Sequence, residues 1–252
     1  MDLQLKGAKA LVTGGTKGIG RAIAERLTDE GCNVSICARN EDEVNAAVAA
    51  FTAKGVTAFG QSVDVGDAAS LKGWIDASAE ALGGIDCVVS NVSGGNAPGE
   101  DGWRANFEYD VLGTVRLVEG AMSHLENSDN ASIIMISSTA ALEKFIAASA
   151  YNAMKGAMVQ YSGALAQDVG PKGIRVNSIC PGPIFIEGGS WDMIKQNMTP
   201  FYDATVADIP VGRMGSAEEV AAQVALLASP LGAFTTGTNV VIDGGFTKRI
   251  QF

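Results

Sequence analysis

Two residues one helical turn apart could do acid–base chemistry: Tyr151 and Lys155, in the stretch SAYNAMKG at 149–156. Residues four apart on a helix lie one above the other, so the phenol would lie beside the ammonium. A free Tyr has a pKa of about 10, and a nearby cation favours the phenolate, which can take a proton from an alcohol. The pair alone leaves open the ordinary alternative, a surface Tyr packed on a Lys stem.

A glycine-rich stretch could hold a phosphate group. The residues TGGTKGIG at 13–20 follow a short apolar run and precede the helical stretch RAIAERLTDEG. Glycines permit a tight turn, and the N-terminus of the following helix presents free N–H groups to a pyrophosphate. The spacing is GxxxGxG rather than GxGxxG, so the position between a strand and a helix supports the interpretation. The expected phosphate contacts are Gly14, Thr16, Lys17, Gly18, Ile19 and Gly20.

The residues after the second apolar run favour a cofactor with a 2′-phosphate. An acidic residue there would hold the adenosine ribose hydroxyls, but the sequence reads CARN at 37–40. Arg39 and Lys17 could flank a phosphate, although each could also be an ordinary solvated charge. We therefore expect NADP(H), with NAD(H) as the alternative. Asp64 and Val65, at the end of the third run, are expected beside the adenine.

Short apolar runs alternate with longer amphipathic stretches along the chain. Seven runs rich in Val and Ile are typical of strands buried on both faces; they are AKALVTG, NVSICAR, AFGQSVDV, IDCVVSN, SIIMISS, IRVNSIC and NVVIDGG. Helices are expected at about 18–30, 41–54, 67–82, 101–126, 149–169 and 216–228. This alternation predicts an α/β fold with a doubly wound parallel sheet and helices on both faces. Without a linker or repeat, a single domain over residues 1–252 is the simplest organisation.

One segment breaks this rhythm. Residues 186–210 separate the sixth strand from the last helix and carry apolar side chains between Gly188 and Pro210. A long insertion with glycine hinges and apolar residues, here including Trp191 and Phe201, is typical of a lid over a pocket. A packed surface excursion or a subunit contact is the alternative.

Composition and charge exclude several classes of function. The chain of 252 residues is 47% hydrophobic and 18% charged, which favours a large folded core over disorder. Its formal net charge of −10 argues against nucleic acid, whose phosphates need a basic face, and against anionic membranes. Because the sequence shows neither a leader pattern nor an apolar stretch of about 18–20 residues, we expect a soluble cytoplasmic protein.

The cysteines and the single histidine favour structural roles. The four cysteines form no CxxC pair and are expected to be buried free thiols. The only histidine, His124, lies near the end of a helical stretch, where a role at the helix terminus is expected. No metal site is expected.

Taken together, the motifs resemble those of the short-chain dehydrogenase/reductase family. The ordered set consists of TGGTKGIG, the serine pair at 137–138, Tyr151 with Lys155, and PGPI at 181–184, and the similarity covers nearly the whole chain. The resemblance implies a seven-stranded Rossmann-like domain, usually a homotetramer, that binds a nicotinamide cofactor and a small-molecule substrate.

The resemblance also implies roles for particular residues. Tyr151 would take the proton of a secondary alcohol, or return it to the forming alkoxide in reduction, and Lys155 would favour its ionised form and hold the nicotinamide ribose. Ser138 would hydrogen-bond the same substrate oxygen, with Ser137 as the alternative. The further cofactor contacts implied are Asn91, Tyr151, Lys155, Pro181, Gly182 and Ile184.

Three positions depart from the family's pattern. The Asn-Asn-Ala-Gly after the fourth strand reads SNVS at 90–93, and the Thr that often follows PGPI is Ile186. The family's fourth catalytic residue, an Asn that holds a water linking the Lys to solvent, is Asp110. We expect Asp110 to keep this relay and to make activity more pH-dependent on the acid side, because it adds a negative charge near Lys155. A rotated, non-catalytic Asp is the alternative, and Asn106, one turn earlier, could share the role.

The expected function is hydride transfer between a nicotinamide cofactor and a secondary alcohol or ketone. The apolar segment 186–210 favours a hydrophobic small molecule, and Phe145 and residues 93–96 could contribute to its pocket. One alternative is a 3-oxoacyl carrier-protein reductase, whose acidic partner the negative charge of this chain would repel. The other is a non-catalytic dinucleotide-sensing regulator, which the retained Ser, Tyr and Lys disfavour.

Overall fold

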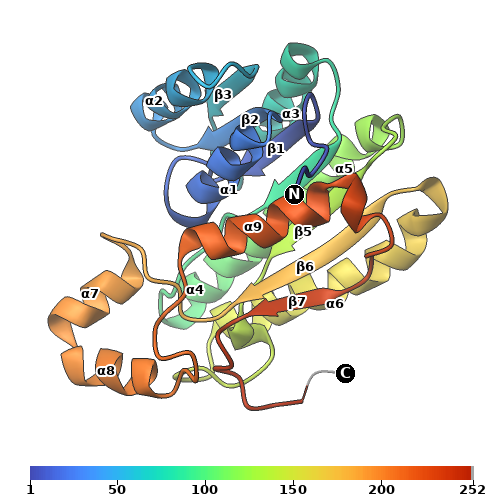
Figure 1. Cartoon of the computed structure of the whole chain (residues 1–252). Coiled ribbons are helices and arrows are strands. Elements are labelled where there is room, and N and C mark those ends of the chain that lie inside the picture. The colour runs from blue at the N-terminus through green and yellow to red at the C-terminus, as the bar shows by residue number, and fades with distance from the viewer. Residues whose placement is uncertain (251–252) are drawn as a thin grey trace.

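Seven short strands form one sheet in the structure, a computed structural model that describes residues 1–250 (Figure 1). The strands are β1 (Lys9–Thr13), β2 (Asn33–Ala38), β3 (Ala58–Ser62), β4 (Cys87–Ser90), β5 (Ser132–Ile136), β6 (Arg175–Pro181) and β7 (Asn239–Ile242). They lie in the order β3-β2-β1-β4-β5-β6-β7, and all neighbours pair in parallel. The doubly wound, Rossmann-like α/β fold predicted from the sequence is confirmed.

Helices cover both faces of this sheet. The α-helices of the described chain are α1 (Gly18–Asp29), α2 (Glu41–Thr52), α3 (Ala68–Leu82), α4 (Gly99–Asn106), α5 (Gly113–Leu125), α6 (Ala150–Val169), α7 (Ser190–Asn197), α8 (Thr199–Ala207) and α9 (Ala217–Ala228). Of these, α7 and α8 project away from the sheet (Figure 1). Side chains of Asn40, Asp67, Ser149 and Ser216 cap the first N–H groups of α2, α3, α6 and α9. The helix starts predicted at 67, 149 and 216 are these capping residues themselves.

Alternate residues of each strand point to opposite faces and so form two separate cores. In β1, Ala10 and Val12 pack with α1, α2 and α9, whereas Leu11 packs with α3, α5 and α6. The largest buried side chain of the first core is Phe51, and that of the second is Trp74. Figure 1 shows α1 and α9 side by side on one face. Burial on both faces explains why the strands read as continuous apolar runs.

The strand order reverses between β1 and β4, which are neighbours in the sheet although β2 and β3 separate them in sequence. In open α/β sheets, ligands bind beyond the carboxyl ends of the strands at such a switch point. The loops after β1, β2, β4, β5 and β6 all begin at this edge, so it gathers nearly every motif found in the sequence.

The long helix predicted over 101–126 is interrupted. α4 begins at Gly99, residues Phe107–Leu112 form a π-helical turn, and α5 continues from Gly113. The hydroxyl of Thr114 donates to the carbonyl of Asp110 (2.6 Å), which satisfies a backbone group inside the irregular turn. A single π-helical turn is frequent at functional sites, and this one contains Asp110.

The segment 186–210 contains two short helices, α7 and α8, which project from the body of the structure (Figure 1). Gly188 precedes α7 with a φ of +69°, a conformation that favours glycine. In the described chain, α7 has no buried residue. The insertion is therefore attached through its ends and a few aromatic contacts rather than through a core of its own.

The remaining expectations concern membranes and cysteines. Among the helices of residues 1–250, none is long and apolar enough to cross a membrane. The four cysteines are free and buried, as predicted. His124 lies in the last turn of α5, where the sequence placed it.

Candidate active site

Two cavities lie at the carboxyl ends of the strands. The first has a volume of about 430 Å³, and we call it the β2 cavity; Thr16, Lys17, Arg39, Glu43, Asp64 and Tyr109 are among its lining residues. The second has a volume of about 590 Å³, and we call it the β5 cavity; Ser138, Phe145, Tyr151, Asn152, Pro181 and Trp191 are among its lining residues. The β2 cavity brings together the residues expected around the adenosine half, and the β5 cavity is lined by two of the four expected catalytic residues, Ser138 and Tyr151.

The N-terminus of α1 has the geometry of a phosphate site. No described side chain caps α1 at Lys17, so the N–H groups of its first turn stay available to an anion. Gly14 and Gly18 have φ values of +66° and +55°, which other residues rarely adopt. A Cβ on Gly20 would lie 2.3 Å from the carbonyl oxygen of Gly14. The backbone of the loop therefore requires these glycines, and the open space above them can take a pyrophosphate.

Asn91 supports the glycine loop instead of facing either cavity. Its side-chain amide donates to the carbonyl of Thr13 (3.0 Å), and its backbone N–H donates to the Thr13 hydroxyl (2.9 Å). The same amide would lie 2.5 Å from a Cβ on Gly20. Asn91 thus ties β4 to β1 behind the loop, whereas its neighbours Val92 and Ser93 line the β2 cavity. The contact of Asn91 with the cofactor stays a prediction, and the structure adds this supporting position.

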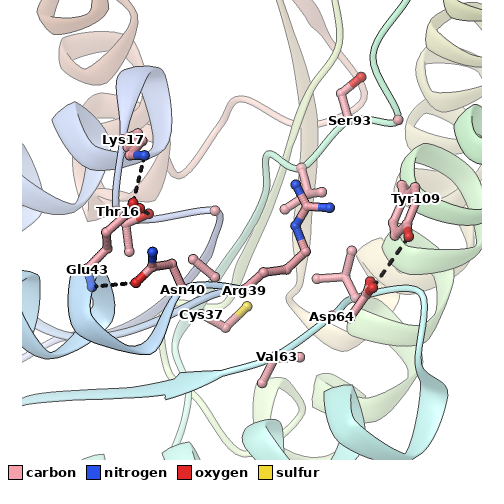
Figure 2. Close-up of a pocket in the computed structure, with 15 residues that line it drawn as sticks. Thr16, Lys17, Cys37, Arg39, Asn40, Glu43, Val63, Asp64, Ser93 and Tyr109 are labelled. Carbon is pink, nitrogen blue, oxygen red and sulfur yellow. Dashed lines mark hydrogen bonds and ion pairs between the residues drawn. The ribbon is translucent and has the colours of Figure 1, made fainter. Parts of the chain in front are cut away.

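The two predicted cations both line the β2 cavity, together with an anion that the sequence did not single out. The ammonium of Lys17 pairs with the Glu43 carboxylate at 2.7 Å, and the Thr16 hydroxyl donates to the same carboxylate at 3.4 Å. Figure 2 shows the Arg39 side chain extending across the cavity between this pair and Asp64. Glu43 was missed because an acid in the first turn of a helix reads as an ordinary helix-start residue.

Asp64 and Val65 also line the β2 cavity, just beyond the end of β3. The Tyr109 hydroxyl donates to Asp64 at 3.4 Å, as Figure 2 shows. Cys37 completes this wall, and burial raises the pKa of its thiol to about 12. The wall therefore offers one carboxylate and an uncharged, apolar surface, which suits a flat heteroaromatic ring.

Lys155 is buried beneath the β5 cavity and holds a fixed position. Its ammonium pairs with the Asp110 carboxylate at 2.9 Å and donates to the carbonyl of Ile136 at 2.9 Å. The side chains of the pair are 3% and 0% exposed. The ammonium also lies 5.8 Å from the centre of the Tyr151 ring. Tyr151 and Lys155 are therefore close together, and the cation is buried.

Asp110 joins two of the positions that depart from the family's pattern. One carboxylate oxygen pairs with Lys155, and the other accepts the N–H of Gly94 (2.8 Å) and the hydroxyl of Ser93 (3.3 Å). The carboxylate therefore contacts both the Lys155 ammonium and the loop after β4 directly. It is not rotated away from Lys155, and no other side chain mediates the contact. Asn106 does not share this place, because its amide donates to the carbonyls of Gly95 and Gly102.

Tyr151 and Ser138 line the same cavity, on α6 and just after β5. The Ser138 hydroxyl oxygen accepts the N–H of Ala140 (3.1 Å), which leaves its proton available for a ligand. The Ser137 hydroxyl instead donates to the backbone carbonyl of Lys155 (2.8 Å). The hydrogen bonds therefore favour Ser138 over Ser137 as the donor to a substrate.

The PGPI stretch lines the same cavity as Tyr151. Pro181, Gly182 and Ile184 all line the β5 cavity, with Ile19 from the start of α1. A Cβ on Gly182 would lie 2.6 Å from the Asp243 side chain, so glycine is required there. Ile186, in place of the family's Thr, lines the same cavity but carries no polar atom on its side chain. Any hydrogen bond made from this position must come from the backbone.

Aromatic and amide side chains also line the β5 cavity. The ring centres of Phe145 and Trp191 are 6.0 Å apart, and Trp191 stacks on Phe201 at 6.1 Å. Asn152 also lines the cavity, and it lies one residue from Tyr151, a signal that the sequence analysis overlooked. Ile146 lines it with a φ of +57°, which is unusual for a β-branched residue and invisible to sequence patterns.

Comparison with known proteins agrees with this arrangement. A family model described as Enoyl-(Acyl carrier protein) reductase matches residues 14–247. An isoepoxydon dehydrogenase of Penicillium expansum is 40% identical over 256 residues, which cover 98% of each chain. A tropinone reductase homolog of Arabidopsis thaliana is 34% identical over 250 residues, covering 96% of this chain and 93% of the other.

Two solved structures extend the comparison to ligands. The L-sorbose reductase from Gluconobacter frateurii, complexed with NADPH and L-sorbose, superposes with a TM-score of 0.91 at 28% identity, covering 99% and 100% of the two chains. A short chain oxidoreductase from Pseudomonas aeruginosa, bound to NADPH and described as containing an atypical catalytic center, superposes with a TM-score of 0.89 at 29% identity, covering 96% and 98%.

Proposed function

Because the chain belongs to the short-chain dehydrogenase/reductase family, we propose that it transfers a hydride between NADP(H) and the secondary alcohol or ketone of a small, largely hydrophobic molecule. The observation that carries this proposal is the shared β5 cavity, in which Ser138 and Tyr151 face one space above the buried ammonium of Lys155. Relatives named as dehydrogenases and reductases support the reaction class.

The residues of the chain fit the cofactor. The uncapped start of α1 and its glycines would hold the pyrophosphate. The β2 cavity would take the adenosine half, with Arg39 and Lys17 for a 2′-phosphate and with Asp64 and Val65 beside the adenine. Pro181, Gly182 and Ile184 would border the nicotinamide half in the β5 cavity. NADPH and NADP in related structures support this choice over NAD(H).

The bound cofactor supplies a carbon centre that accepts or gives the hydride. In oxidation, the ionised Tyr151 oxygen takes the hydroxyl proton of the alcohol while the carbon-bound hydrogen leaves with its electron pair. In reduction, Tyr151 returns a proton to the oxygen that gains negative charge. The Ser138 hydroxyl donates to that same oxygen and fixes its position. Lys155 favours the phenolate by its charge and would hold the ribose hydroxyls with the donor that contacts only the thioether of Met158 at 3.8 Å.

Asp110 stands where the family has the Asn that holds a relay water, and it pairs directly with the Lys155 ammonium. Its carboxylate compensates the buried charge of Lys155 and fixes the ammonium beside Tyr151. A neutral amide in this place would not add a negative charge beside Lys155. The pH profile should therefore fall more steeply on the acid side than it would with a neutral amide.

The lining of the β5 cavity indicates a neutral substrate. No charged side chain among the described residues lines it, and Phe145, Ile146 and Trp191 give it apolar walls. Asn96 and Asn152 add amide groups that can hydrogen-bond hydroxyl or carbonyl oxygens. A neutral, partly oxygenated molecule with a hydrophobic body fits this lining. The anionic phosphopantetheine arm of an acyl carrier protein finds no charged partner in this lining.

We also propose a domain organisation, a lid and an assembly for this chain. The chain forms a single domain in which the segment 186–210, with α7 and α8, acts as a lid over the β5 cavity. Trp191 of this segment lines the cavity and contacts Phe145, which supports this role. A cytoplasmic homotetramer is the assembly that the family resemblance implies. Size-exclusion chromatography with light scattering tests the tetramer.

The proposed function is tested by absorbance at 340 nm, the reduced nicotinamide band. The purified protein is mixed with NADPH and neutral cyclic or acyclic ketones, or with NADP⁺ and the corresponding alcohols. Tyr151→Phe removes the acid–base group and should lower kcat by about 10²–10⁴-fold while the Kd for NADPH stays unchanged.

Tyr161→Phe is the matched control. Tyr161 lies on the same helix, ten positions further along, and packs against the second core rather than lining the β5 cavity. It should keep wild-type turnover. Wild-type turnover in Tyr151→Phe, or no turnover of any substrate by a protein that binds NADPH, would overturn the catalytic assignment.

A further inference from the structure

An anion occupies the place in the β2 cavity where the proposed function puts a 2′-phosphate. The Glu43 carboxylate pairs with Lys17 at 2.7 Å and accepts a hydrogen bond from Thr16 at 3.4 Å. Lys17 and Arg39 are the cations expected to bind that phosphate, and all four residues line the cavity (Figure 2). Glu43 therefore holds one of the two phosphate-binding cations before any ligand arrives.

The start of α2 does not depend on the side chain of Glu43. The helix is capped by Asn40, whose side-chain oxygen accepts the backbone N–H of residue 43, and that bond does not depend on the side chain. Two other acids, Glu41 and Asp42, already favour the helix N-terminus, and both are exposed. The Asn40 cap and the charges of Glu41 and Asp42 therefore stabilise the start of α2 without the carboxylate of Glu43.

The pair is accessible enough to exchange partners. The Lys17 side chain is 75% exposed and that of Glu43 is 31% exposed. Exposed ion pairs are weak because solvent screens them and because two long side chains must be ordered. A dianionic phosphate can therefore draw Lys17 away from Glu43, but it must do so beside a carboxylate that repels it.

From this geometry we infer that Glu43 sets how strongly the site selects a 2′-phosphate. It is an internal competitor for Lys17, and it reduces the preference for NADP(H) over NAD(H) that Lys17 and Arg39 would otherwise give. The inference rests on the proposed function for the identity of the ligand. It concerns binding, so it is tested without turnover.

Removing the charge of Glu43 should tighten binding of nucleotides that carry the 2′-phosphate. Glu43→Gln keeps the length of the side chain and an oxygen for Thr16 to donate to, and it frees the Lys17 ammonium. The Kd for NADPH and for the fragment 2′,5′-ADP should fall about two- to fivefold, the range expected for one exposed ion pair. The Kd for NADH and for 5′-AMP should change by less than about 1.5-fold, because they lack that phosphate.

The measurement is isothermal titration calorimetry on the full chain with each of these four nucleotides. Glu41→Gln is the matched control, because it removes the same charge from the same helical turn without a contact to Lys17. It should change all four Kd values by less than about 1.5-fold. The gain in Glu43→Gln should also shrink when KCl is raised from about 0.05 to 0.5 M, because salt screens exposed charges.

Each outcome decides between the two proposals. A wild-type protein that binds NADPH, with a Glu43→Gln variant that binds it equally or more weakly, overturns the role of Glu43 and leaves the proposed function intact. An equal gain in Glu41→Gln also overturns it, since net charge would then explain the effect. A wild-type protein that binds none of the four nucleotides overturns the proposed function and this inference together.

Discussion

Replacing Asp110 with Asn removes one charge from the most buried ion pair of the protein and changes almost nothing in shape. Asp110 is 0% exposed and Lys155 3%, and their charged atoms are 2.9 Å apart. In Asp110→Asn the ammonium keeps the carbonyl of Ile136 but loses its only buried counter-charge in the described chain. We expect a folded but less stable protein.

The magnitude follows from burial. Removing one partner of a buried pair costs about 3–5 kcal/mol, because the remaining charge stays desolvated and uncompensated. The amide oxygen that replaces the carboxylate and the retained Ile136 bond place this variant at the lower end, about 3 kcal/mol. For a chain of about 250 residues, that corresponds to a fall in Tm of about 6–12 °C.

Chemical unfolding followed by circular dichroism measures the effect at one fixed protein concentration. The set comprises the wild type, Asp110→Asn, Lys155→Met and the double variant, which form a double-mutant cycle. Each single variant leaves one member of the pair buried without its counter-charge, whereas the double variant removes both charges. The loss of stability in the double variant should therefore be smaller than the sum of the two single losses, by at least about 1 kcal/mol. Ser93→Ala, which removes two long hydrogen bonds of the Ser93 hydroxyl (to Asp110 and from the Gly95 N–H, each 3.3 Å) but no charge, should cost less than about 1 kcal/mol.

The same variants test the effect of the pair on catalysis. With a carboxylate beside Lys155, the wild-type rate should fall more steeply on the acid side than the rate of Asp110→Asn. Superimposable pH–rate profiles would reject the catalytic reading of Asp110. A loss of stability below about 1 kcal/mol in Asp110→Asn, or strict additivity in the cycle, would refute the reasoning about the buried pair.

Two further predictions concern the lid and the thiols. Trp191→Ala removes the contact of the lid with Phe145 and the stacking of Trp191 on Phe201 within the lid, so the KM for the ketone should rise about tenfold while the NADPH Kd and the Tm change little. A large fall in Tm at unchanged KM would instead indicate a packing or subunit role. Burial raises the pKa of Cys37 to about 12 and that of Cys87 to about 11, above their ordinary value of 9.0. Because the unfolded thiols ionise first, the free energy of unfolding should be unaffected by these groups below pH 9 and should fall as the pH rises toward 11 to 12, by about 1 kcal/mol per thiol at pH 10; a flat urea midpoint between pH 8 and 10 would contradict this.

The fold was predictable because its signals are local and repeated. Strands buried on both faces give continuous apolar runs, and capping residues such as Asp67 and Ser216 mark helix starts within one position. The π-helical turn at 107–112 was not predictable, because it depends on how the helix packs against Lys155 and the loop after β4. A regular helix has the same sequence pattern.

The candidate site was predictable where a residue type and a spacing coincide, as for Tyr151 and Lys155. Partnerships between distant segments were not. Glu43 and Lys17 are 26 positions apart, and their pairing depends on the approach of α2 to the glycine loop. The hydrogen bond from the Asn91 amide to the carbonyl of Thr13, 78 positions away, is another such partnership.

The bridge made by Asp110 links three pieces of chain that recombination or loop grafting would treat as independent. The carboxylate contacts Lys155 on α6 and the Ser93–Gly94 loop at the same time, so it fixes their positions relative to each other. A chimera that imports the loop after β4 from a relative with a neutral amide at position 110 would leave this carboxylate without half of its partners. In a chimera, the loop after β4 and the π-helical turn that carries Asp110 should therefore be exchanged together. Directed evolution of substrate range should vary positions 93, 94 and 110 together or leave all three unchanged.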